Sequence, residues 1–224
     1  MTFEPLPLPD RADYSDDRAA AEAGEFFARM KTRHTVRHFD ERPVPHGIIA
    51  DCVAAAGRAP SGANQQPWHF AAIAAPHLKA EIRKAAEAEE KAFYEGGAGD
   101  AWLKALEPIG TDASKPHLER APWLIVVFAQ RWGVADDGAR YKHYYVPESV
   151  GIATGFLLCA LHHAGLSTLT HTPNPMGFLN DLLGRPPQEK PVMIIAVGHP
   201  TADATVPRAA KWKKPLDDIL SVHA

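Results

Sequence analysis

The sequence has few cysteines and no long apolar run. Of its 224 residues only Cys52 and Cys159 are cysteines, and they stand in separate alanine-rich stretches without CxxC spacing. This excludes a disulfide framework and a zinc knuckle, and it is typical of a reducing compartment. No stretch reaches 18 consecutive apolar residues, so no membrane span is predicted. Because the N-terminus lacks the apolar core of a signal peptide, we expect a cytoplasmic protein.

An excess of positive charge is missing as well. Lysine and arginine number 24 against 27 aspartates and glutamates, a net charge of −3, which gives no surplus for binding a polyanion. A Rossmann glycine fingerprint, a Walker loop, a nucleophile elbow and an HExxH motif are all absent. The adjacent His162 and His163 point to different faces of a predicted helix, which is poor geometry for one ion. No metal site is predicted.

The chain does contain alternating helical and apolar strand-like segments, which indicates a layered α+β domain. Pro5, Pro7 and Pro9 predict an extended arm over residues 1–17. The domain itself is expected over 18–200. The tail, 201–224, is apolar and basic, and it is expected to pack on a partner subunit. Helices are predicted at about 15–32, 46–58, 76–94 and 148–165. Strands are predicted at 68–73, 122–128 and 191–198. Residues 167–172 are expected to be a short strand or a loop, and residues 131–147 are expected to be a loop.

The loop between the helix ending near Arg58 and the strand at 68–73 reads Pro60-Ser61-Gly62-Ala63. Pro60 ends the helix, and the three small residues after it let backbone N–H groups approach a ligand closely. The alternative is an ordinary connection between a helix and a strand.

A second segment, Arg33-His34-Thr35-Val36-Arg37, forms a compact cradle for an anion. Two arginines four residues apart flank a hydroxyl group, and His34 adds further donors. A solvated basic patch is the alternative interpretation.

Together with the strand at 191–200, these two motifs resemble the FMN-dependent nitroreductase superfamily, over residues 30 to 221. Three further features are similar to its iodotyrosine deiodinase branch. They are Leu169-Thr170-His171-Thr172-Pro173-Asn174-Pro175-Met176, the pattern Glu90-x-x-x-Tyr94 with Lys115 before residues 118–122, and the late run from 204–207 to Lys213-Lys214-Pro215-Leu216-Asp217. Two residues are inserted near 208–211 relative to the family.

The resemblance implies a three-layer fold with a central mixed sheet flanked by helices, and a homodimer with an exchanged terminal extension. It implies two FMN molecules at the subunit interface. At the phosphate and ribityl end, the expected cofactor contacts are Arg33, His34, Thr35 and Arg37, with Lys213 as a further basic contact. The other subunit is expected to contribute Pro60, Ser61 and Gly62. Along the isoalloxazine the expected contacts are Thr170, His171 and Thr172. Thr172, near flavin N5, is the expected catalytic residue.

The substrate site implied by the resemblance contains Ala63, Glu90, Tyr94 and Lys115. An amino acid zwitterion needs an anion for its ammonium and a cation for its carboxylate, and Glu90 and Lys115 supply these. Tyr94 shares a helical face with Glu90 at a spacing of four residues. The glycines at 96–99 lie between the contributors, as a lid over 88–117 requires. The alternative is that Glu90 and Lys115 are surface charges.

The function implied is FMN-dependent reductive dehalogenation of halotyrosine, from iodotyrosine to tyrosine and iodide, in one-electron steps. Three alternatives stay open: a broad NAD(P)H-dependent nitroreductase or quinone reductase, the flavin-destroying branch that makes the lower ligand of cobalamin, and a non-catalytic flavin-binding protein. The sequence identifies neither the halogen nor the electron donor nor the pathway.

Overall fold

The computed structural model describes residues 3–8 and 11–223 in two compact units, residues 1–33 and 34–224. Pro9, part of the predicted arm, and Ala224, the end of the predicted tail, lie outside the described residues. In the first unit, the described residues before α1 (Asp16–Lys31) form neither helix nor strand. The predicted helix is confirmed, and the Ser15 hydroxyl caps it by accepting from the Arg18 N–H.

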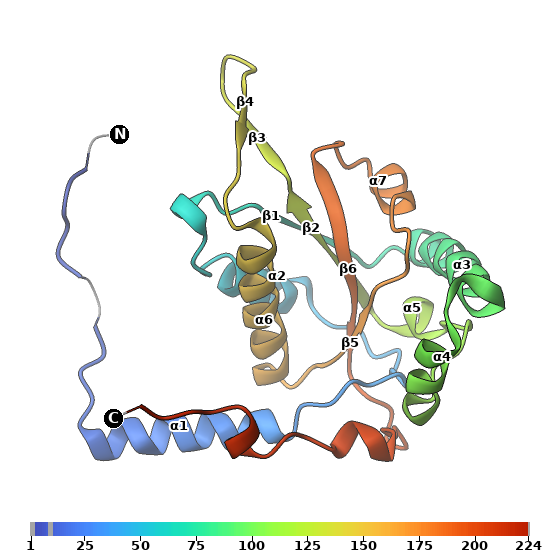
Figure 1. The fold of residues 1–224 in the computed structure, drawn as a ribbon, viewed down its shortest axis with the longest axis horizontal. Helices are drawn as coiled ribbons and strands as arrows, with labels where there is room; N and C mark the ends of the chain where they lie inside the picture. Colours follow the sequence, from blue (N-terminus) through green and yellow to red (C-terminus); the bar gives the residue numbers. More distant parts are fainter. Residues whose placement is uncertain (1–2, 9–10, 224) are drawn as a thin grey trace. The chain divides into compact units, whose positions relative to one another are not determined.

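A four-stranded sheet organises the second unit (Figure 1). Its order is β1 (Trp68–Ile73), β2 (Trp123–Gln130), β6 (Glu189–Gly198) and β5 (Ser167–His171). All three neighbouring pairs are antiparallel. The parallel component of the expected mixed sheet is a single bridge between Thr35 and Thr168, beside β5.

The strands β2 and β6 are buried on both faces. Leu124, Val126 and Phe128 pack into one apolar cluster, whereas Ile125, Val127 and Ala129 pack into another, as the period of two in a strand dictates. The first cluster lies against α3 (Pro76–Ala92), α5 (His117–Arg120) and α7 (Phe178–Leu183), and the second lies against α2 (His46–Ala56) and α6 (Val146–His163). The expected three layers are therefore present (Figure 1).

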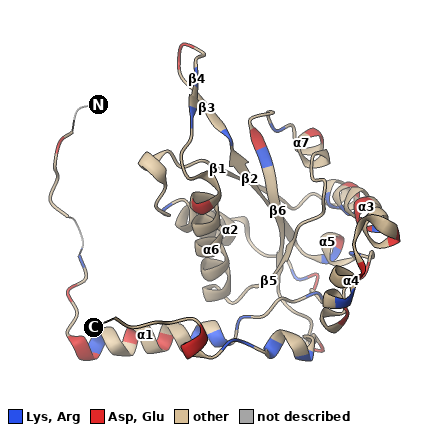
Figure 2. Cartoon of the chain, viewed as in Figure 1, with Lys and Arg blue, Asp and Glu red and all other residues tan. Residues whose placement is uncertain are grey.

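Charged residues are sparse on the sheet: β6 carries Glu189 and Lys190 at its start, and the other three strands carry none. Figure 2 shows β1, β2 and β5 free of charged residues, while α3 carries both signs. Within the described residues, no helix combines the length and the apolar character that a membrane crossing needs.

The predicted lid region is broken into short pieces, as its glycines indicated. After α3 come a π-helical turn at Phe93–Gly97, α4 (Asp100–Leu106) and a 3-10 turn at Glu107–Ile109. Gly96 has φ +153°, a conformation that side chains disfavour, so the helix breaks there. Further along, the tail forms two 3-10 turns, Arg208–Lys211 and Leu216–Asp218.

The expected loop at 131–147 is in part a β-hairpin, so that expectation was wrong. β3 (Trp132–Val134) pairs with β4 (Arg140–Lys142), and the hairpin projects from the sheet in Figure 1. Its turn uses Gly138 at φ +83°, and the Arg140 guanidinium lies 4.9 Å from the centre of the Trp132 ring. The strands are too short for apolar alternation to identify them, although Asp137-Gly138 is a recognisable turn sequence.

Two buried histidines lie between the sheet and α3. The rings of His117, on α5, and His171, on β5, meet edge to face with centroids 6.0 Å apart. Burial, together with the nearby charges of Lys115, Arg37 and Arg83, lowers the pKa of His117 to about 4. Burial also lowers the pKa of His171 to about 3, helped by Lys115 and His117. Both imidazoles are therefore neutral at physiological pH.

This predicts a loss of stability in mild acid. A histidine in the unfolded chain binds a proton below about pH 6.5, whereas these two in the fold do not, so stability is complete above that pH and falls as the pH drops towards 4. Each histidine adds a slope of up to about 1.4 kcal/mol per pH unit. We expect His117→Phe to flatten the pH dependence of urea unfolding between pH 6 and 4. His163→Phe, at an exposed position of α6, is the control, and an equal flattening in it would contradict the assignment.

Candidate functional site

The predicted anion cradle runs alongside the edge strand β5. The Val36 N–H donates to the Thr168 carbonyl at 3.1 Å, and Thr35 bridges Thr168. Arg33 ends the first unit, where its N–H donates to the Met30 carbonyl. The bridge at Thr35 places His34, Thr35 and Arg37, all partly buried, beside the strand that carries Thr170 and is followed by Thr172.

Arg37 is a half-buried cation. Burial lowers the pKa of its guanidinium, and this effect is partly offset by Tyr94 and Asp112 of the lid region. Among the described residues, none of the ion pairs within 4.0 Å involves Arg37. A desolvated guanidinium of this kind is suited to an anionic group supplied from outside the chain.

Thr170, in β5, and Thr172, directly after it, flank His171 in the sequence. Thr170 and Thr172 are exposed, whereas His171 is buried. The side chain of His171 contacts the lid region instead, with its Nε2 3.7 Å from Glu90 Oε1. His171 was predicted to line a flavin with its neighbours, but this orientation leaves only its backbone on the threonine side.

Glu90 and Lys115 form a buried ion pair. Lys115 Nζ lies 3.2 Å from Glu90 Oε2, and the two side chains are only 4% and 14% exposed. The Lys115 ammonium also donates to Thr111 Oγ1 at 3.1 Å and to the Asp112 carbonyl. The interpretation of Glu90 and Lys115 as surface charges is therefore wrong, because neither faces bulk water.

Tyr94 closes over the same ion pair. Its ring centre lies 5.7 Å from Lys115 Nζ, and its hydroxyl donates to the Thr111 carbonyl at 3.1 Å. Burial raises the pKa of Tyr94, and the carboxylates of Glu90 and Asp112 raise it further, against the opposing effects of Thr111 and Arg37. The three residues predicted to read a zwitterion are thus in one cluster.

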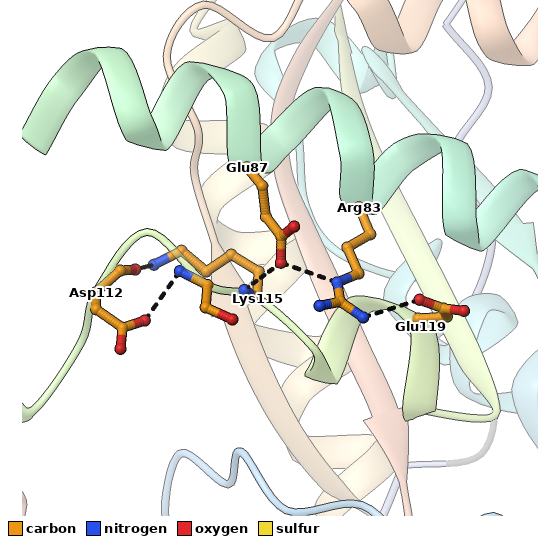
Figure 3. A network of polar contacts seen from close by, with 6 residues as sticks. Arg83, Glu87, Asp112, Lys115 and Glu119 are labelled. Carbon is orange, nitrogen blue, oxygen red and sulfur yellow. Dashed lines mark hydrogen bonds and ion pairs between the residues drawn. The ribbon is translucent and has the colours of Figure 1, made fainter.

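A second network, which the sequence did not reveal, anchors the backbone at Lys115 (Figure 3). Glu87 Oε1 accepts from the Lys115 N–H at 2.7 Å and from Arg83 Nε at 2.8 Å, and Arg83 reaches Glu119 Oε2 at 2.9 Å. Burial opposes ionisation of Glu87, but Arg83 and the Lys115 N–H outweigh it and lower its pKa. The sequence feature that could have indicated this network is the spacing of four residues between Arg83 and Glu87, which places them on one helical face.

The loop after α2 is held in an unusual conformation. Ala63, Asn64 and Gln66 have φ values of 50°, 52° and 50°, which few residues other than glycine adopt. Backbone strain of this kind is concentrated at ligand sites, and it persists only where surrounding contacts impose it. Here the Ser61 hydroxyl accepts from the Gln66 N–H at 2.9 Å.

The segment before α6 supplies the other contacts. The Gln65 side chain donates to the Lys142 carbonyl at 2.9 Å and accepts from the Tyr144 N–H at 2.8 Å, while Ser149 Oγ accepts from the Gly62 N–H. A Cβ atom at Gly62 would lie 2.6 Å from the Tyr144 carbonyl oxygen. Glycine is therefore required there by the chain itself, a packing role that sequence reasoning missed.

Lys213 lies in the tail, beyond the inserted residues. Its ammonium donates to the Ala210 carbonyl at 2.7 Å and to the Trp212 carbonyl at 3.3 Å, so it caps the 3-10 turn at Arg208–Lys211, where the insertion was expected. Among residues 3–8 and 11–223, no group of three His, Cys, Asp or Glu side chains is arranged to hold a metal ion.

The structure brings together some predicted residues and separates others. Arg37, Glu90, Tyr94, Lys115 and His171 influence or contact one another on the α3 side of the sheet. The loop with Ser61, Gly62 and Ala63 follows α2 and is fastened to the start of α6, in the opposite layer. One chain therefore carries two separate halves of the predicted site.

Comparison with known proteins gives consistent matches. A model of the nitroreductase family matches residues 30–199. An iodotyrosine deiodinase from Haliscomenobacter hydrossis is 48% identical over 196 residues, which cover 88% of each protein. Human iodotyrosine deiodinase 1 is 40% identical over 208 residues, covering 92% of this chain and 71% of the human protein.

A solved structure agrees with these relatives. The crystal structure of an oxidized iodotyrosine deiodinase bound to FMN and 3-iodo-L-tyrosine matches with a TM-score of 0.74 and 30% identity, over 89% of this chain and 98% of that one. The family model spans most of the chain, and the relatives align over most of their own length. The chain therefore belongs to the nitroreductase family, on its iodotyrosine deiodinase branch.

Proposed function

We propose that this protein is an FMN-dependent oxidoreductase that reductively dehalogenates halotyrosine, releasing tyrosine and halide. The observation that carries the proposal is the buried Glu90–Lys115 pair beneath Tyr94, in a chain whose relatives are named iodotyrosine deiodinases. A nitroreductase that accepts many aromatic substrates has no use for a buried pair of opposite charges.

The donor set fits FMN. Arg37, Thr35 and His34 beside β5, with Arg33 before them, offer guanidinium, hydroxyl and imidazole groups suited to a phosphate and a ribityl chain. The exposed Thr170 of β5 and the exposed Thr172 that follows the strand would lie along the ring system. When bound, FMN supplies the electrons for breaking the carbon–halogen bond, and the protein orients and tunes it. Lys213 would add a further cationic contact to the phosphate.

Glu90 and Lys115 would bind the two charged groups of the amino acid. Glu90 takes the ammonium and Lys115 the carboxylate, so the zwitterion replaces the direct 3.2 Å contact between the two side chains. Because both groups are already desolvated, little further burial is needed. The phenol would lie over the flavin, with the Ala63 N–H hydrogen-bonded to its oxygen and the lid at 88–117 closed above it.

The working unit would be a homodimer with FMN at the interface. The 60–63 loop and the Glu90 cluster lie in opposite layers of one chain, so a complete site is formed most simply by two chains. Large apolar side chains of α1 and of the tail are exposed, among them Phe27 at 63%, Trp212 at 70% and Ile219 at 67%. On α6, Gly151 and Gly155 face open space.

The same proposal assigns the remaining parts of the chain. The arm is 1–17, the FMN-binding domain 18–200, and the extension 201–224 packs on the partner subunit. The electron donor would be NAD(P)H. A cytoplasmic location is supported by the two free cysteines, Cys52 and Cys159.

Glu90→Gln and Lys115→Ala should each weaken iodotyrosine binding while FMN binding is retained. Removing one partner of a desolvated charge pair costs on the order of 2–5 kcal/mol. Titration of flavin fluorescence measures the affinity. The exposed lid residues Glu95→Gln and Lys104→Ala serve as matched controls. A plain iodophenol should bind poorly and be nearly indifferent to both changes, and equal losses for iodophenol and iodotyrosine would contradict the assignment.

Thr172→Ala should separate two reactions that the protein can catalyse. A hydroxyl at flavin N5 contributes a net hydrogen bond of roughly 0.5–1.5 kcal/mol, which shifts the balance between one- and two-electron chemistry severalfold. We expect dehalogenation to fall while FMN binding and hydride-type reduction of a nitroaromatic persist or rise. Thr170→Ala is the neighbouring control. An unchanged ratio of the two turnover rates would remove Thr172 from the mechanism.

Deleting the tail from Thr201 should weaken dimerisation and FMN retention together, since the proposed site needs both subunits. Analytical ultracentrifugation and the ratio of flavin to protein absorbance measure the two effects. A monomer that keeps stoichiometric FMN would contradict the two-chain site.

A further inference from the structure

His171 is the one described residue of β5 that contacts the acid of the lid. Its Nε2 lies 3.7 Å from Glu90 Oε1, while Lys115 Nζ lies 3.2 Å from the other oxygen, Glu90 Oε2. On either side of His171 in the sequence are Thr170, in the strand, and Thr172, directly after it, and both are exposed whereas His171 is buried. Through this one side chain, the carboxylate of the lid touches the strand proposed to lie along FMN.

The contact is between a neutral imidazole and a carboxylate. Burial holds the pKa of His171 at about 3, and the charges of Lys115 and His117 act in the same direction. In a neutral imidazole one ring nitrogen carries a proton and the other carries a lone pair. A lone pair facing the carboxylate oxygen would be repelled, so the favoured tautomer places the proton on Nε2, towards Glu90.

The 3.7 Å between His171 Nε2 and Glu90 Oε1 is too long for a hydrogen bond. His171 Nε2 is buried and has no hydrogen-bond partner within range in the described part of the chain. An N–H···O bond is about 2.9–3.0 Å long, so Oε1 has to approach by roughly 0.7–0.8 Å. A carboxylate that releases Lys115 and turns towards an incoming ammonium is free to make that movement. The buried donor is then satisfied.

We propose that His171 is a positioning residue for halotyrosine recognition, whose Nε2–H holds the Glu90 carboxylate in place as Glu90 exchanges Lys115 for the substrate ammonium. This inference rests on the proposed function.

The simplest competing role is packing, through the edge-to-face contact with His117. Two substitutions distinguish the roles. His171→Leu keeps an apolar body and removes the donor, whereas the amide nitrogen of His171→Gln reaches a position close to that of Nε2. His69→Leu removes a half-buried histidine from β1 of the same sheet and is the matched control.

The experiment measures iodotyrosine affinity by flavin fluorescence in the FMN-loaded protein. We expect His171→Leu to bind at least about tenfold more weakly, His171→Gln to stay within about threefold of the wild-type protein, and His69→Leu to be unchanged. Binding of 2-iodophenol, which has no ammonium, should be the same in all four proteins. In the Glu90→Gln background, His171→Leu should have little further effect, because the two residues act as a unit.

A second measurement does not depend on substrate. In protein labelled with ¹⁵N-histidine, His171 should show the Nε2–H tautomer and stay neutral from pH 8 to pH 5. The Nδ1–H tautomer, unchanged iodotyrosine affinity in His171→Leu, or equal losses in the Leu and Gln variants would each overturn the positioning role alone. Failure of the wild-type protein to bind iodotyrosine would overturn the proposed function, and the positioning role with it.

Discussion

The structure depends on one constraint: β2 and β6 are buried on both faces. Because each strand sends alternate side chains into two separate apolar clusters, helices must cover both sides of the sheet. Residues that follow α2 and residues that follow α3 are thereby placed in opposite layers. The loop at 60–63 and the Glu90–Lys115 pair therefore lie in opposite layers of the chain.

The buried charges of the site are tolerated because of the groups that surround them. Isolated charges are expensive to bury, and each one here has partners close by. Lys115 has Glu90, Thr111 and a carbonyl, while Glu87 has Arg83 and a backbone N–H. His117 and His171 are buried in the neutral form instead, since the cations around them and their burial both disfavour protonation. Arg37 is an exception: it is half-buried, and within the described residues none of the ion pairs involves it.

Much of this could be predicted from the sequence, for reasons of local physics. The runs at 122–128 and 191–198 are largely apolar, the signature of strands covered on both sides, and the helix at 16–31 follows a capping serine and carries apolar residues at helical spacing. The opposite orientation of His171 relative to Thr170 and Thr172 could also be predicted from the sequence, because it follows from the period of two in a strand. The hairpin at 132–142 was not predicted, because strands of three residues are too short to show an alternation of apolar and polar residues.

The sequence by itself determined the long helices and the apolar strands, and it placed groups of polar, charged or small residues at 33–37, 60–63 and 90–115, because each of these depends on residues close together in the chain. The tertiary structure decided which of them meet. It buried Lys115 against Glu90, placed His171 beneath that pair, and required glycine at position 62 because the Tyr144 carbonyl lies against it. Those contacts join residues 25 to 82 positions apart, and only the packing of layers on a shared sheet specifies such distances.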